Sequence, residues 1–289
     1  MNRMKLTKPK MIPKATLLAA MICWLSSTMF AQQPQFDQPA NPHPSFFRTV
    51  AGDVGYVFTS PLRMSTADGV KLALFSGITA GLILYGDEGW DEEFGIEGYH
   101  DLLKPLQSFT KPGKWYDDTS TLVFFGGLSA AMLGGGLAFR DHKLLETTRL
   151  MSESFVLTQL LMVVSKRLIG RSRPFNNEGA TEFHLFRLRN ERAYHSMPSS
   201  HTASIFSMMT VIAKQYPQWW IRYPAYAFGL SVALERADSR NHWASDILLG
   251  GAVGYCVGNL LVKRTRLNGG HFAVSPSISF RQAGVSIRF

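Results

Sequence analysis

Two histidines stand where the chain could use them for catalysis. His201 follows the residues MPSS and opens an apolar run that predicts a helix. The first N–H groups of a helix have no internal partner and carry the positive end of its dipole, so an anion such as phosphate can bind there. His242 lies four residues before Asp246. If that helix begins at Asn241, both side chains share a face and the carboxylate can orient the imidazole, as in nucleophilic triads.

Positive charge accompanies both histidines. Lys166 lies at the end of a helical run. Gly170 and Pro174 follow it and make continuation of that helix unfavourable. Lys166 and Arg173 can therefore converge from the helix end and the following loop. Two imidazoles, several cations and a helix N-terminus supply a nucleophile, an acid for the leaving group and charge for phosphate oxygens, as metal-free phosphoryl transfer requires. Each cluster alone also fits a simpler role, such as an N-cap, a helix-surface pair or a basic stretch beside a membrane.

Read together, the clusters resemble the three-part signature of the type-2 phosphatidic acid phosphatase and vanadium haloperoxidase superfamily. The matching residues are Lys166-x6-Arg173-Pro174, then Pro198-Ser199-Ser200-His201, then Arg236-x5-His242-x3-Asp246. The resemblance covers Lys166 to Asp246 directly and implies the helical bundle of that family.

The resemblance implies a metal-independent phosphatase with a phosphohistidine intermediate and no cofactor. His242 would be the nucleophile, Asp246 would orient it, and His201 would be the general acid. Five residues would hold the phosphate: Lys166, Arg173, Ser199, Ser200 and Arg236. A soluble periplasmic acid phosphatase of broad specificity and a vanadate-dependent haloperoxidase are the alternatives, because both use the same signature.

The chain departs from the family pattern at two positions. Ser200 stands where the family usually has glycine, so the backbone there approaches phosphate less closely, although a serine hydroxyl could add a donor. Glu235 precedes Arg236, where serine is common. A carboxylate beside Arg236 would weaken its hold on a dianion unless the side chain points away, as neighbouring helical residues often do.

Long apolar runs predict an all-α bundle of about six helices, because each run is too long for a typical strand. The runs are Leu72–Tyr85, Thr119–Phe139, Leu150–Val164, Thr202–Ala213, Tyr223–Leu234 and Ile247–Val262. Only Thr119–Phe139 reaches the length of about 18 uncharged residues expected of a membrane span. The mean hydropathy of −0.01 is modest for an embedded bundle. A membrane-embedded bundle and a soluble or peripheral one therefore both remain open.

The ends of the chain predict export and a separate tail. Five cations precede the apolar stretch Ala15–Phe30, the arrangement of a secretory signal, which we assign to residues 1–31. An uncleaved anchor is the alternative, because Met29 stands where a cleavage site prefers a small residue. Residues 32–45 are rich in Gln, Pro and Asn and predict a linker; residues 46–267 form the helical domain. In residues 268–289 apolar side chains alternate with small and polar ones, which predicts a β-hairpin-like tail. With Cys23 in the signal and Cys256 in an apolar run, no structural disulfide is expected.

Charge and composition narrow the partners. The formal net charge of +9 suggests an anionic partner, and with the signature it favours a phosphorylated lipid or another phosphate ester over nucleic acid. The sequence predicts a protein of the cell envelope, either membrane-associated with its site facing the periplasm or periplasmic. The acidic stretch GDEGWDEEFGIEGYHD, from Gly86 to Asp101, lacks the spacing of an EF-hand and predicts a solvated loop rather than a metal site.

Overall fold

The computed structural model describes residues 46–96, 104–186, 188–189, 191–267, 273–279 and 282–288. The predicted signal, residues 1–31, and the predicted linker, residues 32–45, lie outside these ranges. The described part is helical apart from one short β-hairpin and irregular connections. The all-α prediction is therefore confirmed.

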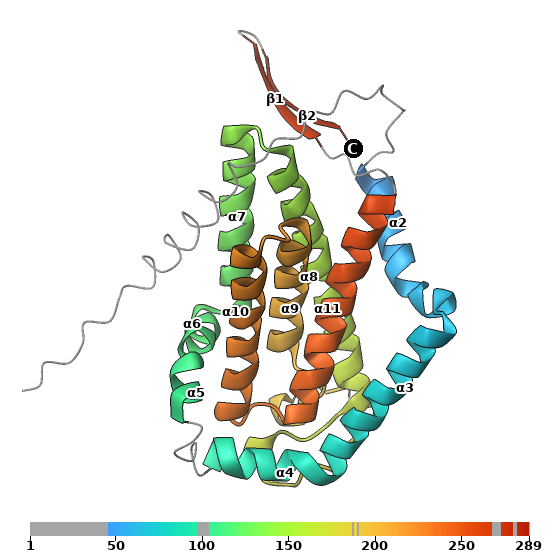
Figure 1. The fold of residues 1–289 in the computed structure, drawn as a ribbon, viewed down its shortest axis with the longest axis vertical. Helices are drawn as coiled ribbons and strands as arrows, with labels where there is room; N and C mark the ends of the chain where they lie inside the picture. The colour runs from blue at the N-terminus through green and yellow to red at the C-terminus, as the bar shows by residue number, and fades with distance from the viewer. Residues whose placement is uncertain are drawn as a thin grey trace, which may run out of the picture. The chain divides into compact units, whose positions relative to one another are not determined.

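Five long helices form the bundle shown in Figure 1. They are α7 (Thr121–Phe139), α8 (His142–Ile169), α9 (Ser200–Gln215), α10 (Trp219–Asp238) and α11 (Ala244–Leu267). Helix α9 packs against α8, α10 and α11, and α7 packs on α8. Because neighbours surround it, nearly every residue of α9 from Thr202 to Ala213 is buried, serines and threonines included.

Glycines bring α9 and α11 unusually close together. A methyl group added at Gly250, Gly254 or Gly258 of α11 would lie 2.5, 2.1 or 2.7 Å from a backbone oxygen of α9. Their spacing of four places all three on one helix face, where only hydrogen fits against the α9 backbone. This contact begins at Ser199, so it fixes the start of α9 beside the start of α11.

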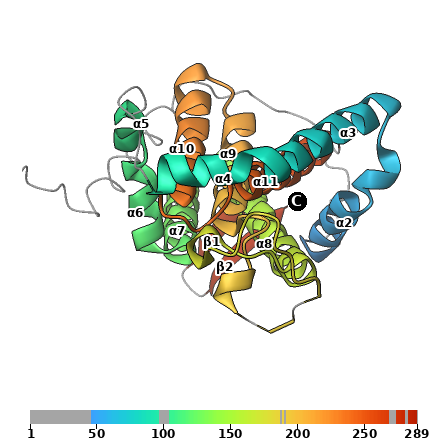
Figure 2. The ribbon, with the colours of Figure 1, turned by 90° about the horizontal axis from the view of Figure 1, so that it is seen from below.

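A helical segment before the bundle crosses the end at which α9 and α11 begin. It starts with α3 (Thr66–Gly81), passes through a π-helical turn (Leu82–Gly86) and α4 (Asp87–Trp90), and ends in a second π-helical turn (Asp91–Ile96). Figure 2 shows α4 across the ends of α10 and α11. Contacts of α4 with α11, and of the second π-helical turn with α10, place the segment there. Other elements are α2 (Phe46–Phe58), a 3-10 turn (Ser60–Arg63), α5 (Lys104–Phe109) and α6 (Lys111–Thr119).

The crossing segment corrects the interpretation of the acidic stretch as a solvated loop. Its described part, residues 86–96, is helical, and Asp87 is buried. Asp91 accepts three hydrogen bonds from the Arg240 guanidinium, two from Nε at 2.9 and 3.1 Å and one from Nη2 at 2.6 Å. Residues 97–101 of the stretch lie outside the described ranges. The acidic residues that open it are therefore structural partners of arginines.

Within the described residues, three helical segments are long and apolar enough to cross a membrane, where the sequence suggested one. They are Thr66–Ile96, Thr121–Phe139 and Ala244–Leu267. Large apolar side chains of α3 and α7 are exposed, among them Leu74, Ile78, Leu122 and Val123. Exposed apolar surface of this extent indicates a lipid environment. The protein is accordingly membrane-associated.

The alternating tail forms a two-stranded hairpin. Strand β1 (Ala273–Ser279) pairs antiparallel with β2 (Gln282–Arg288), in a register that sets Ala273 opposite Arg288. The period-two pattern of the sequence predicted this pairing.

Candidate active site

Four helix ends bring all eight predicted site residues into one place. Lys166 lies near the end of α8 and Arg236 near the end of α10, while Ser199 caps the start of α9 and Asp246 lies in the first turn of α11. The remaining members are Arg173, Ser200, His201 and His242. The backbone N–H of Ser199 donates to the carbonyl of Asp246 at 3.0 Å, which joins the second and third signature segments directly.

His242 lies at the bottom of the site as a neutral imidazole. Its side chain is 1% exposed, and among the described residues neither ring nitrogen has a hydrogen-bond partner. Burial, followed by the charges of Arg173, Lys166 and Arg236, holds the pKa of His242 well below its usual range. The ring therefore keeps a free lone pair at neutral pH, as a nitrogen nucleophile requires.

The expected helical pairing of His242 with Asp246 is wrong in detail. Helix α11 begins at Ala244, so His242 belongs to the preceding turn rather than to the same helix face. The turn nevertheless brings Nδ1 of His242 to 3.8 Å from Oδ2 of Asp246, just beyond hydrogen-bond distance. Asp246 Oδ2 accepts instead from the Ser196 hydroxyl at 2.5 Å and from the Trp243 N–H at 3.0 Å.

A buried network beside His242 joins Asp246 to the crossing segment. Arg171, wholly buried, donates from Nη1 to Asp246 and from Nη2 to Asp87, both at 2.7 Å. Asp87 also accepts from the backbone N–H of Ser245 at 2.9 Å and from its hydroxyl at 2.5 Å. Arg171 thus holds two carboxylates apart with one planar fork, a geometry that lysine cannot supply.

A second, more open network surrounds the proposed acid. Arg236 forms an ion pair with Asp117, with Nη2 2.6 Å from Oδ2, and Oδ1 of Asp117 lies 3.4 Å from Nε2 of His201. Burial raises the pKa of Asp117, but the hydrogen bond and charge of Arg236 prevail and hold it below its usual value. Burial and then the charge of Arg236 lower the pKa of His201, whereas Asp117 opposes this.

Glu235 does not point away from Arg236. Its carboxylate accepts from Nε of Arg236 at 2.5 Å. Arg236 is therefore bonded to two carboxylates, Glu235 and Asp117, and an arriving phosphate must compete with them. This geometry supports the expectation that Glu235 weakens the binding of a phosphate dianion by Arg236.

Lys166 and Arg173 converge as the sequence predicted. Both donate to the carbonyl of His195, at 2.8 and 3.4 Å. Arg173 also donates to Oδ1 of Asn241 at 3.1 Å, and Arg192 donates to the same oxygen at 2.9 Å. Burial, and then the charge of Arg192, lowers the pKa of Arg173 to about 10, so it remains a cation at neutral pH.

Sequence reasoning missed the partners of the signature residues. Arg171 lies inside the first signature segment and was hidden among neighbouring cations. Ser196, Arg192 and Asp117 lie outside the three segments, and nothing in their local sequence distinguishes them from surface residues. One signal was available for Asp87. The apolar helical pattern before it continues into the acidic stretch, which indicates that Asp87 lies on a helix.

Comparison with known proteins finds similarity over the helices that carry the site. Residues 148–269 match the PAP2 superfamily. A lipid A 1-phosphatase from Porphyromonas gingivalis is 36% identical over 84 residues, which cover 28% of this chain and 19% of that protein. One from Rhizobium johnstonii is 28% identical over 155 residues, which cover 48% of this chain and 57% of that protein. The alignments thus span less than two thirds of either relative.

Two solved structures are similar over most of their length. The crystal structure of Aquifex aeolicus LpxE has a TM-score of 0.43 at 20% identity, covering 61% of this chain and 94% of that one. The first transmembrane PAP2 type phosphatidylglycerolphosphate phosphatase from Bacillus subtilis has a TM-score of 0.49 at 19% identity, covering 68% and 94%.

Proposed function

Residues 148–269 form a PAP2 superfamily domain, and on that premise we propose that the protein is a metal-independent phosphatase acting on a lipid phosphomonoester or diphosphate. The observation that carries the proposal is the depth of the two histidines. The His242 side chain is 1% exposed and the His201 side chain 33% exposed. A phosphate bound between the two histidines would have the nucleophile His242 on its buried side. Its leaving group would lie on the exposed side, near His201, where there is room for a lipid.

The first half of the reaction forms a phosphohistidine. The negative charge of the bound phosphate favours protonated His201, against the burial and the Arg236 charge that lower its pKa, so His201 takes up a proton as the substrate binds. Nε2 of His242 attacks phosphorus in line, the bond from phosphorus to the leaving oxygen breaks, and His201 gives that oxygen its proton. Asp246 stabilises the imidazolium that forms. Positive charge around the three equatorial oxygens comes from Lys166 and Arg173, together with Arg236 and the start of α9.

The second half releases phosphate. The alcohol has left, so water can occupy its position beside His201, which is now a neutral base. His201 takes a proton from that water as its oxygen attacks phosphorus, and the bond from phosphorus to His242 breaks. Inorganic phosphate leaves, and both histidines return to their starting protonation states.

Lipid as the substrate class is supported by the surroundings of the site. Three helical segments are long enough to cross a membrane, and their apolar side chains are exposed. The curated relatives named above are lipid A 1-phosphatases. A soluble periplasmic acid phosphatase would leave these apolar surfaces in water, which disfavours that alternative.

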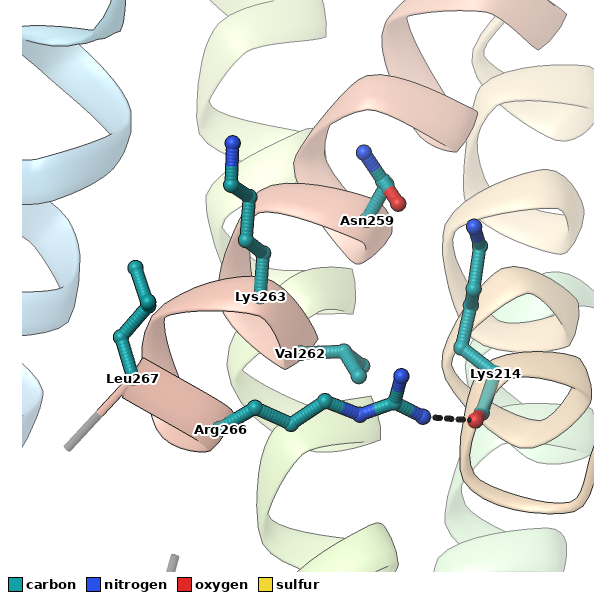
Figure 3. A pocket seen from close by; sticks show the side chains of 6 residues that line it. All are labelled: Lys214, Asn259, Val262, Lys263, Arg266 and Leu267. Atoms are coloured by element: carbon teal, nitrogen blue, oxygen red, sulfur yellow. Dashed lines mark hydrogen bonds between the residues drawn. The ribbon is translucent and has the colours of Figure 1, made fainter. Parts of the chain in front are cut away.

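An orientation with the site facing the periplasm is supported by the far end of the bundle. Figure 3 shows Lys214, Lys263 and Arg266 around a shallow depression between the C-terminal parts of α9 and α11. These helices begin at the site, so the basic depression lies at the opposite end. Excess Lys and Arg marks the cytoplasmic side of membrane proteins. With an export signal at residues 1–31, the site would then face outward.

Phosphate release from a panel of lipids tests the proposal. The purified protein should release phosphate from one or more of phosphatidic acid, phosphatidylglycerol phosphate, isoprenyl diphosphate and lipid A with a chelator present. Labelled substrate should leave an acid-labile phosphoprotein that His242→Ala lacks. Activity that disappears with chelator and returns with magnesium would refute the metal-free mechanism.

A further inference from the structure

An apolar stripe on α8 leads directly to a protruding tip beside the site. The α8 stripe consists of four exposed apolar residues spaced by four, so that they share one helix face: Val156, Leu160, Val164 and Leu168. At its end, the carbonyl of Leu168 accepts a hydrogen bond from the N–H of Phe186 at 3.0 Å. We define the tip as Leu185, Phe186, Leu188 and Arg189.

The tip presents large apolar side chains outward. Leu185 is 65% exposed, Phe186 70% and Leu188 73%. Within the described part of the chain, these three stand together on one irregular connection. A protein keeps such a group exposed only where something apolar covers it.

The backbone beside the tip is fixed, so this exposure is built into the fold. The N–H of His184 donates to the carbonyl of Gly170 at 2.9 Å, and the N–H of Ser172 donates to the carbonyl of Glu182 at 3.0 Å. Phe186 has a φ of 59°, in the left-handed region that bulky residues rarely adopt. Such strain persists where the surrounding structure imposes it, and it often marks a functional segment.

Cations lie where lipid phosphates would be. Arg167 is exposed one residue before the last member of the α8 stripe. The side chain of Arg189 in the tip is 86% exposed and forms an ion pair with Glu191, with Nε 3.4 Å from Oε1, so a lipid phosphate would compete with that carboxylate. Apolar side chains beside arginines are the composition of segments that rest at the boundary between headgroups and acyl chains. A second copy of the chain would bring the same arginines toward each other, so anionic lipid is the better occupant.

From this continuity of stripe, tip and cations we propose that the tip inserts into the headgroup–acyl boundary of an anionic leaflet, next to the active site. Leu185, Phe186 and Leu188 enter the apolar boundary, while Arg167 and Arg189 bind lipid phosphates. The paired segment that carries the tip also carries Arg171 and Arg173, so insertion sets the depth at which a substrate phosphate meets the site. The depth-setting role rests on the proposed phosphatase function; the insertion does not.

Depth-dependent quenching tests insertion directly. The full chain with Cys23→Ser and Cys256→Ser would carry a nitrobenzoxadiazole label at Phe186→Cys, Leu160→Cys or Thr181→Cys, in phosphatidylglycerol–phosphatidylcholine vesicles. The label at 186 should be quenched by lipids spin-labelled near the headgroup, and the label at 160 by lipids spin-labelled deep in the chain. Exposed Thr181, four residues before Leu185, is the aqueous control and should respond to iodide alone.

Two results would overturn insertion. One is a label at 186 that iodide quenches as strongly as the control at 181, with no quenching by lipid. The other is cross-linking of two chains through the cysteine at 186 without lipid quenching, which would make a second copy the occupant. Both readouts are independent of catalysis, so a protein without phosphatase activity would leave the insertion test intact.

A change of side chain without change of backbone tests the role in catalysis. Phe186→Gly suits a positive φ and removes the whole benzyl side chain. Together with Leu185→Ser and Leu188→Ser it should lower turnover of lipid phosphate in vesicles about tenfold, because the site no longer sits at headgroup depth. Hydrolysis of p-nitrophenyl phosphate in solution should stay at the parent rate. Equal losses on both substrates, or no loss on either, would reject the depth-setting role.

Discussion

Each of the two histidines of the site lies beside an arginine–carboxylate pair, and the two pairs differ in burial. On the nucleophile's side, Arg171 bonds Asp246, and both side chains are 0% exposed. On the acid's side, Arg236 bonds Asp117, whose side chain is 36% exposed. A sealed pair can hold one position only, because separating it would leave a buried charge uncompensated. An open pair can exchange its partner for a substrate phosphate.

This difference matches the two chemical roles. The nucleophile must keep one orientation throughout the reaction, whereas the acid must give and then take a proton at the mouth of the site. Changes on the sealed side should therefore affect every substrate and the fold itself. Changes on the open side should depend on the leaving group and on pH.

Removing the nucleophile should have the largest effect. We expect His242→Ala to lower kcat by roughly 10⁴-fold or more on every phosphate ester and to abolish the phosphoprotein. Rapid-quench experiments with labelled substrate measure both. A variant that keeps about a tenth of the parent rate would remove His242 from the mechanism.

Removing the acid should discriminate between substrates. His201→Ala should lose roughly 10²–10⁴ in rate on an alkyl phosphate, whose alkoxide needs a proton, and much less on p-nitrophenyl phosphate, whose phenolate is stable. Phosphoprotein should still form from the activated ester. Ser199→Ala is the matched comparison and should slow both substrates alike, because anion binding does not depend on the leaving group. Equal losses in the His201 variant would make that residue a phosphate ligand instead.

Breaking the sealed pair should reduce stability and kcat together. Arg171→Lys cannot bond Asp87 and Asp246 at once, and losing one partner of a buried pair typically costs about 3–5 kcal/mol. Thermal unfolding in detergent should show a lower Tm, and kcat should fall while vanadate affinity holds, since Arg171 acts through Asp246. Arg222→Lys, exposed in the first turn of α10 and so at the end of that helix away from the site, is the control and should leave both unchanged. A stable Arg171→Lys protein with parent kcat would show that the network does not position Asp246.

The sequence predicted which residues gather at the candidate site and missed the residues that hold them in place. His242, His201 and the cations were identifiable because spacing and residue type express their chemistry directly. Asp87 and Asp117 bond residues far away in the chain, at Arg171 and Arg236, and such pairing depends on how helices pack rather than on local pattern. The bundle itself followed from long apolar runs. The start of α11 did not, because residues 241–243 form a turn stabilised by contacts with the Asp246 side chain and the Arg236 carbonyl.

The open pair should give the smallest effect and the one most dependent on pH. The negative charge of Asp117 raises the pKa of His201, against burial and Arg236, which lower it. General acid catalysis needs His201 protonated, so kcat on an alkyl phosphate falls as pH rises through that pKa in the substrate complex. Asp117→Asn removes the raising charge, and the fall in kcat should therefore move to lower pH, by up to about one unit for a partly exposed partner.

The same substitution frees Arg236 from one of its two carboxylates, so KM should decrease modestly while the kcat profile shifts. Asp118→Asn, the exposed neighbour on α6, is the control and should leave the profile in place. Profiles of kcat against pH for the parent and both variants measure the effect. A shift toward higher pH in Asp117→Asn, or an equal shift in the control, would mean that Asp117 does not tune the acid, and the contrast between a sealed and an open side would lose its chemical meaning.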